Sequence, residues 1–99
     1  MAGYLGAVTV GMDVTSVDVE GDITSTDTSP EVTLQNTTEE DTDGGRESKI
    51  TFKGEQSGGE VSTLAQIQAS HDGTADDEKG DLIFSTNDGS DGNTPTERM

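Results

Sequence analysis

The chain has 99 residues, of which 26% are hydrophobic and 3% aromatic, and its 21 acidic and 5 basic residues give a net charge of −16. So acidic a chain lacks the Lys/Arg patch that neutralises phosphates, which excludes nucleic-acid binding of that kind and attraction to anionic membranes. It contains no cysteine, which excludes disulfides, thiolate metal sites and thiol catalysis. No apolar run approaches the roughly 20 residues of a membrane helix, so membrane insertion is not expected.

The shortage of apolar side chains also bears on folding. Typical globular domains are about 45–50% apolar. Each ordered residue costs about 1.5 kcal/mol of conformational entropy, and buried apolar area returns about 25 cal/mol per Å². An isolated copy therefore lacks material for a core. The composition by itself is typical of a disordered chain, but the spacing of the apolar residues favours strands that order by assembly.

The first segment alternates between apolar and polar residues, with acids in the later polar positions. The apolar positions are Val8, Val10, Met12 and Val14, and, after a one-residue slip at Thr15 and Ser16, Val17, Val19 and Ile23. Alternation with β-branched residues predicts a strand, and a bulge at the slip would keep one apolar face. Asp18, Glu20 and Asp22 then form an acidic row on the outer face. We treat residues 1–29 as one strand segment.

Four further strands are predicted after a turn at 27–30, where Asp, Ser and Pro favour reversal of the chain. They cover residues 31–36, 49–53, 63–70 and 81–86, and the last three are separated by Gly-containing loops that are mostly acidic. Residues 87–99 are rich in Asp, Gly, Asn and Thr and are expected to form a loop. Gly44-Gly45 and Gly58-Gly59 are interpreted as turns that need positive φ.

Two parts of the chain resemble each other. Each contains an apolar-x-apolar-Gln strand, an acidic loop that contains glycine, and an apolar-x-Phe strand. The two units are offset by 33 positions, from Leu34 to Ile67. This offset is within the range of repeat architectures. We therefore expect two strand-loop-strand units, at about 30–60 and 61–99. Each is a hairpin with a long solvated loop, or two strands of one β-layer, and needs another surface for stability, because a lone hairpin is marginal in water. Three copies around an axis would supply that surface better than two.

No residue group is arranged for chemistry, so we assign no catalytic, cofactor-binding or metal-binding residue and expect a protein that is not an enzyme. His71 is the only histidine and is interpreted as an exposed loop residue. Three groups of oxygen ligands were considered for calcium, but none has the spacing of an EF-hand. They are Asp41, Asp43 and Glu47; Asp72, Asp76, Asp77 and Glu78; and Asp88, Ser90, Asp91 and Asn93.

The stretches Leu64-Ala65-Gln66-Ile67-Gln68-Ala69, Gly80-Asp81-Leu82-Ile83-Phe84-Ser85-Thr86 and Thr96-Glu97-Arg98-Met99 carry a resemblance. The chain, from about residue 30 to 99, resembles the shaft repeats of phage tail fibres and virion appendages upstream of endosialidase-type intramolecular chaperone domains. The resemblance implies an elongated, intertwined homotrimeric β-fibre, of β-prism or triple-β-helix type, with long acidic loops. It also implies a virion location, contacts with other virion structural proteins and a role in host attachment, where a host surface glycan is a possible partner. The family continues beyond Glu-Arg-Met, so the chain is expected to be truncated at its C-terminus.

The expected function is therefore a structural component of a trimeric phage fibre shaft. Two alternatives stay open. The first is an extracellular adhesin or calcium-dependent carbohydrate-binding module. The second is a hydrolase or lyase acting on polysaccharide from an acidic groove.

Overall fold

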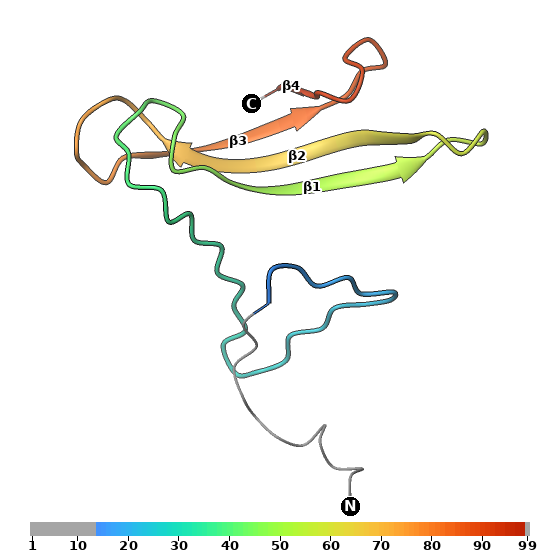
Figure 1. The fold of residues 1–99 in the computed structure, drawn as a ribbon, viewed down its shortest axis with the longest axis horizontal. Coiled ribbons are helices and arrows are strands. Elements are labelled where there is room, and N and C mark those ends of the chain that lie inside the picture. The colour runs from blue at the N-terminus through green and yellow to red at the C-terminus, as the bar shows by residue number, and fades with distance from the viewer. Residues whose placement is uncertain (1–13, 99) are drawn as a thin grey trace, which may run out of the picture. The chain divides into compact units, whose positions relative to one another are not determined.

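The computed structural model describes residues 14–98, and the chain divides into two units, Met1–Val32 and Thr33–Met99. All strands of the described residues lie in the second unit. They are β1 (Ser48–Glu55), β2 (Val61–His71), β3 (Gly80–Thr86) and β4 (Thr96–Glu97), which form one antiparallel sheet in the order β1-β2-β3-β4 (Figure 1). The all-β prediction is confirmed, while the trimeric fibre stays a prediction. Residues 14–98 contain no helix long and apolar enough to cross a membrane.

Three predicted strands are confirmed with slightly wider bounds. The predictions over 49–53, 63–70 and 81–86 correspond to β1, β2 and β3. The turn between β1 and β2 is closed by backbone bonds from Gln56 N–H to the Glu60 carbonyl and from Gly59 N–H to the Gln56 carbonyl, both 2.8 Å. Gly44 and Gly59 have φ of 81° and 93°, so one glycine of each pair takes the predicted left-handed conformation.

The strand register places the alternating apolar residues on one face of the sheet. Ile67 in β2 lies opposite Ile50 in β1 and opposite Phe84 in β3. Because side chains alternate along a strand, Phe52 and Leu82 share this face. We call it the apolar face and define it by its large side chains: Ile50, Phe52, Leu64, Ile67, Leu82 and Phe84.

A bulge keeps Leu64 on the same face. The register between β1 and β2 shifts after Phe52, where Phe52 pairs with Ala65 and Lys53 pairs with Thr63, so Leu64 is the extra residue. A Cβ on Gly54 would lie 3.1 Å from Leu64 Cδ1, so the Leu64 side chain covers this glycine. The bulge thereby adds a large apolar residue to the face where strict alternation would have turned it away.

The structure corrects the prediction for the residues before β1. Residues 14–47 belong to no strand, so neither the described part of the predicted 1–29 strand nor the predicted strand at 31–36 is formed; residues 8–13 lie outside the described residues. The chain bends at Glu20 and Gly21, and the Asn36 Oδ1 accepts a bond from Thr38 N–H (2.9 Å), a local turn that ends the extended run. The physical reason is that a strand needs a backbone ladder with a neighbour, and within residues 14–98 this segment has none. Its contacts with the start of β1 use side chains, since Asn36 Nδ2 donates to the Glu47 carbonyl (2.8 Å) and the Ser48 hydroxyl to the Leu34 carbonyl (3.5 Å).

The predicted repeat is present only in its second unit. Residues 61–99 contain the β2–β3 hairpin, whereas residues 30–60 lack the first strand of their hairpin. β1 instead pairs with β2, so both Phe-containing strands flank the same central strand. The predicted tail loop also differs, because Thr96 and Glu97 pair with Thr86 and Ser85 to form β4. The unit limits at 29/30 and 60/61 stay a prediction.

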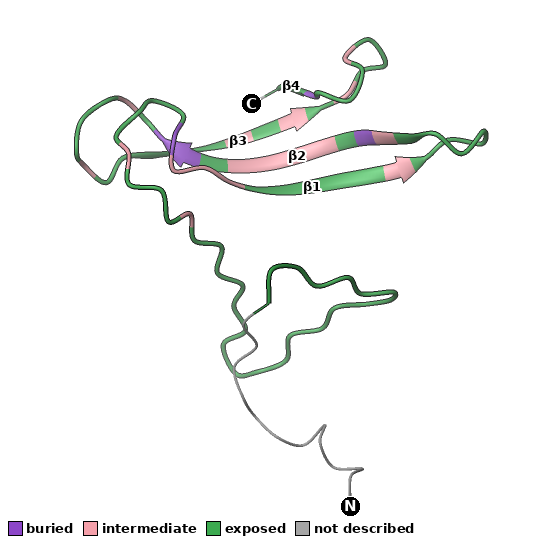
Figure 2. Cartoon of the chain, viewed as in Figure 1, coloured by how far each residue is buried: buried purple, intermediate pink, exposed green. Residues whose placement is uncertain are grey.

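In this sheet the buried residues are polar and the large apolar residues are exposed or half-buried, which is the reverse of an ordinary globular domain. Among residues 14–98 no hydrophobic side chain is buried, and the buried polar residues are Thr63, Ser70 and His71 (Figure 2). Phe52 and Leu82 keep 48% and 60% of their surface exposed. The described chain therefore has no hydrophobic core, as its composition predicted.

Candidate functional site

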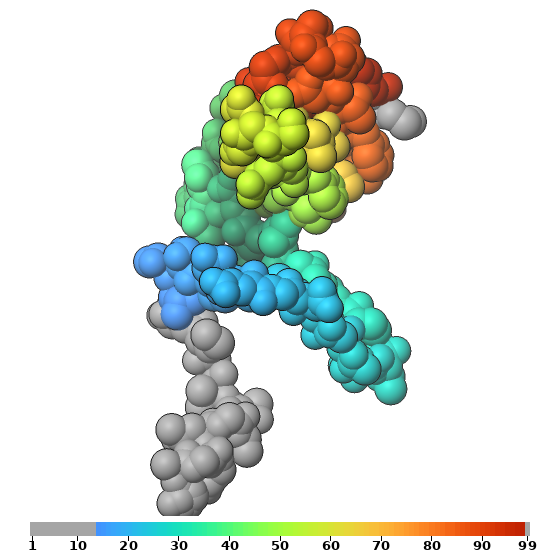
Figure 3. All heavy atoms as spheres, turned by 90° about the vertical axis from the view of Figure 1, so that its right-hand side faces the viewer, coloured from blue at the N-terminus to red at the C-terminus, as the bar shows by residue number. Residues whose placement is uncertain are grey.

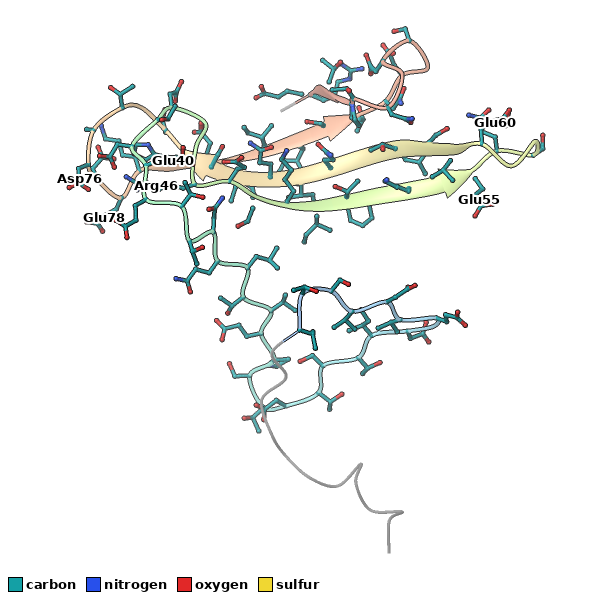
Figure 4. The ribbon with its side chains drawn as sticks, viewed as in Figure 1. Glu40, Arg46, Glu55, Glu60, Asp76 and Glu78 are labelled. Carbon is teal, nitrogen blue, oxygen red and sulfur yellow. The ribbon has the colours of Figure 1, made fainter. Side chains whose placement is uncertain are left out.

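A polar cluster closes one end of the sheet, where the chain enters β1 and passes from β2 to β3. We call it the clasp; it joins the loop at 40–47, the end of β2 and the loop at 72–79. Gly44 N–H donates to the His71 carbonyl and His71 N–H donates to the Gly45 carbonyl, both at 2.8 Å. Glu40, Arg46, Asp76 and Glu78 all lie at this end, while Glu55 and Glu60 lie by the opposite turn (Figure 4). The clasp thus ties three separate segments together without apolar burial.

Arg46 is the main connector of the clasp. Its Nε donates to the Glu40 carbonyl (2.6 Å), its Nη1 to the Asp77 carbonyl (2.8 Å) and its Nη2 to Asp41 Oδ1 (2.5 Å). Its own N–H donates to Glu40 Oε2 at 3.0 Å. Arg46 also has φ of 53°, a left-handed conformation that is uncommon outside glycine. The guanidinium group spreads its donors over three nitrogens in a plane and so binds partners on different sides, whereas a lysine has a single donor nitrogen.

His71 lies at the centre of the clasp, contrary to the prediction of an exposed loop residue. It is the last residue of β2 and is only 2% exposed. Its Nε2 lies 2.9 Å from Asp77 Oδ1 and its Nδ1 lies 3.3 Å from the Thr42 carbonyl. The prediction failed because it relied on the polar residues that adjoin His71 in the sequence. The residues that bind its ring, Thr42 and Asp77, lie 29 and 6 positions away, in two loops.

Both ring nitrogens of His71 face acceptors, which favours the doubly protonated imidazolium. The hydrogen bond to Asp77 raises the pKa of His71 above its usual value of 6.5, with burial and the Arg46 charge opposing and the Thr42 carbonyl assisting. The same bond lowers the pKa of Asp77 below its usual 3.8. Because neither nitrogen is free to accept a proton from a substrate, the pair is suited to holding structure and not to general base catalysis.

Three of the seven acidic residues in the first two groups considered for calcium bind other residues of the chain. In the first two groups, Asp41 binds Arg46, Asp43 Oδ1 accepts from Gly73 N–H (2.8 Å), and Asp77 binds His71. The structure brings these two groups together across the clasp, which sequence spacing did not predict. Among residues 14–98, no three or more His, Asp or Glu side chains are placed to hold a metal ion.

The third group organises the loop after β3. Asn93 Oδ1 accepts from Thr63 N–H and Asn87 Nδ2 donates to the Thr63 carbonyl, both at 3.0 Å, so two side chains take the place of a backbone ladder beside β2. Residues of this loop and of the β1–β2 turn line one hollow, and Figure 3 shows the loop, in orange, above the turn, in yellow-green. Asp88 and Asp91 lie 3.3 and 3.4 Å from Arg98 Nη2. A bond from the Ser90 hydroxyl is the main cause that lowers the pKa of Asp88.

The apolar face is the other notable surface of the sheet. It presents six large apolar side chains from three adjacent strands, and every one of them is exposed or half-buried. Full burial of such a side chain is worth about 1.5–3 kcal/mol, and roughly half of that remains to be gained at each residue. Soluble monomers rarely expose contiguous apolar patches of this kind unless the patch is an interaction site.

The opposite face is mostly polar, apart from the half-buried Ile83, and its β1 edge carries positive charge. Lys49 and Lys53 project from β1 on this side, and both are exposed. No ion pair joins either lysine to another residue of the described chain, whereas Arg46, Lys79 and Arg98 are all paired with aspartates. Two of the five basic residues therefore stand together on the outer strand of the sheet.

Comparisons with known proteins leave the chain without an assigned family. No family model, no curated protein and no solved structure matches it. The site must accordingly be interpreted from its own residues.

Sequence reasoning missed the clasp and found the apolar face. The face follows from alternation at Ile50 and Phe52, at Ala65 and Ile67, and at Leu82 and Phe84. The clasp depends on contacts between loops, which leave little periodic signal. One signal in the sequence could have indicated the clasp. Arg46 directly follows the Gly44-Gly45 turn in an acidic stretch, and an arginine there is expected to bind several acceptors nearby.

Proposed function

We propose that this chain is a non-enzymatic structural component of a phage tail fibre or similar virion appendage, where it contributes to a trimeric shaft involved in host attachment. The observation that carries the proposal is the exposed apolar face on a sheet that has no core. Such a sheet pairs its strands within one chain but leaves its hydrophobic surface for another copy. The sequence resemblance to fibre shaft repeats supplies the virion context.

A trimer accounts for the geometry of the face. Each copy offers one flat apolar surface of three strands, and three such surfaces around an axis would enclose a common interior. The acidic loops at 72–79 and 87–93 lie at the ends and margins of the sheet, so they would remain in solvent. Their charge would keep the assembled shaft soluble and would oppose stacking of further copies.

The experiment is a measurement of mass in solution by sedimentation velocity and multi-angle light scattering over a wide concentration range. The proposal predicts a β-rich trimer whose circular dichroism signal strengthens on association. A folded 10.3 kDa monomer at all concentrations would refute it. Depolymerisation of a capsular polysaccharide by the purified trimer would refute its non-enzymatic part.

A further inference from the structure

The free edge of the sheet and the segment before it are complementary in pattern. Among residues 14–98, β1 pairs with a strand on one side only, since the sheet order begins with it, and Leu34 and Asn36 contact only its start at residues 47–48. An unpaired strand edge exposes N–H and C=O groups that can bind another strand. Along this edge, apolar and basic residues alternate: Ile50 and Phe52 point to the apolar face, and Lys49 and Lys53 point to the other.

Residues 17–23 show the opposite charge in the same alternation. Val17, Val19 and Ile23 occupy one set of positions and Asp18, Glu20 and Asp22 occupy the other. In the structure this segment is in no strand, and Val17 and Ile23 are 64% and 83% exposed. The segment is seven residues long against eight in β1. It therefore has the length, the β-branched side chains and the period of a strand, but no partner strand within the described part of the chain.

We propose that residues 17–23 of a second copy of this chain add to the free edge of β1 as a further strand. In that pairing the valines and the isoleucine extend the apolar face beside Ile50 and Phe52, and the acidic row lies beside Lys49 and Lys53. A shift by one residue would place carboxylates on the apolar face, so the charges specify the register. The bend at Glu20 and Gly21 straightens on docking, which a glycine permits without steric strain.

A second copy is the occupant because a single chain leaves this segment exposed. Each copy carries a net charge of −16, so copies repel one another. Addition of this strand offsets the repulsion, because it places acids beside Lys49 and Lys53, which form no ion pair with an aspartate or glutamate of the described chain. The inference rests on the proposed assembly and specifies the surfaces that bring the copies together.

The test is a charge-reversal rescue followed by sedimentation velocity. Lys49→Glu with Lys53→Glu gives one variant, and Asp18→Lys with Asp22→Lys gives the other. Each variant alone should associate about tenfold or more weakly than the unmodified chain, because attractive cross-strand pairs become repulsive. An equimolar mixture should recover association in part, because two of the three contacts in a mixed trimer join unlike variants and are attractive. The control, Asp27→Lys with Glu31→Lys, changes the net charge as much as the second variant does and should leave association within about twofold.

The outcomes separate this inference from the proposed assembly. If the unmodified chain does not associate, the assembly itself is refuted. If it associates and both reversal variants associate equally well, the strand addition is refuted while the assembly stands. Hydrogen exchange of the unmodified chain gives a second measurement that needs no variant. Amides of residues 17–23 should become protected as concentration rises, and protection that is independent of concentration would show that the segment docks on its own chain.

Discussion

The clasp and the apolar face belong to the same sheet but are stabilised by opposite means. The clasp buries a histidine and binds it with carboxylate and carbonyl groups, whereas the face exposes Ile50, Phe52 and Leu82 to solvent. In a globular domain the apolar groups would be inside and the ion pairs outside. The difference indicates that hydrogen bonds shape the single chain, and that most of the available hydrophobic stabilisation is not realised within its described residues.

The largest effect is expected from a substitution in the apolar face. Ile67→Asp places a carboxylate in the centre of the apolar face, where association would bury it at a cost of about 3 kcal/mol or more. Association should be lost by sedimentation velocity. Gln68→Asp is the matched control, because Gln68 is the next residue of β2 and points to the polar face. Equal loss in both variants would show that the apolar face is not the contact surface.

A smaller effect is expected at the clasp. Arg46→Lys keeps the charge but loses the fork that binds Glu40, Asp41 and Asp77, which should lower the free energy of unfolding by about 1–3 kcal/mol. Chemical denaturation at a fixed protein concentration measures the loss. Hydrogen exchange at the His71 amide should increase while exchange at the centre of β2 changes little. Uniform loosening of the whole sheet would contradict the view that the clasp is a local device.

The pH dependence tests the charged pair in the clasp. The pKa of His71 is raised above 6.5, so its stabilisation is complete below about pH 6.5 and is lost as pH rises through the folded value. The pKa of Asp77 is lowered below 3.8, so its contribution is present above pH 3.8 and is lost as pH falls through the folded value. Thermal unfolding should therefore give the highest Tm between these limits. His71→Gln should remove the decline on the alkaline side, and an unchanged decline would assign it to other groups.

The smallest effect is expected at the rim of the clasp. Lys79 Nζ lies 3.8 Å from Asp77 Oδ2 and its side chain is 72% exposed. Exposed pairs of this geometry contribute little, so Lys79→Ala should change Tm by less than about 3 °C. Differential scanning fluorimetry of this variant and of Arg46→Lys would show whether Tm depends on the number of charges or on the geometry of the partly buried bonds. A loss as large as that of Arg46→Lys would favour charge count.

The predicted strands show which part of the fold follows from local pattern. β1, β2 and β3 were predicted because Ile50 with Phe52, Ala65 with Ile67, and Leu82 with Phe84 recur at every second position between Gly-rich turns. The same pattern at Val17 and Val19 and at Val32 and Leu34 gave strands that the structure does not have. Alternation reports a segment's ability to form a strand, while a neighbour with free backbone groups decides whether the strand forms.

The clasp and the strand order could not be predicted for a related reason. His71 and Asp72 are adjacent in sequence, yet the side chain that binds His71 is Asp77, and its second acceptor is the Thr42 carbonyl from another loop. Likewise, the internal repeat predicted that residues 31–36 and β1 form one hairpin or two strands of one layer, but residues 31–36 form no strand and β1 pairs with β2. Short strands of this kind can pair in several orders, and the turns and loops that join them decide which order forms.

The sequence by itself determined that this protein is β-rich, strongly acidic and too poor in apolar residues to build its own core, because these properties depend only on composition and on the spacing of side chains along an extended backbone. The tertiary structure alone decided which strands pair, that Leu64 joins the apolar face through a bulge, and that His71 is buried in a charged clasp. Those features depend on contacts between residues far apart in the chain, where geometry and the exclusion of water set the energies.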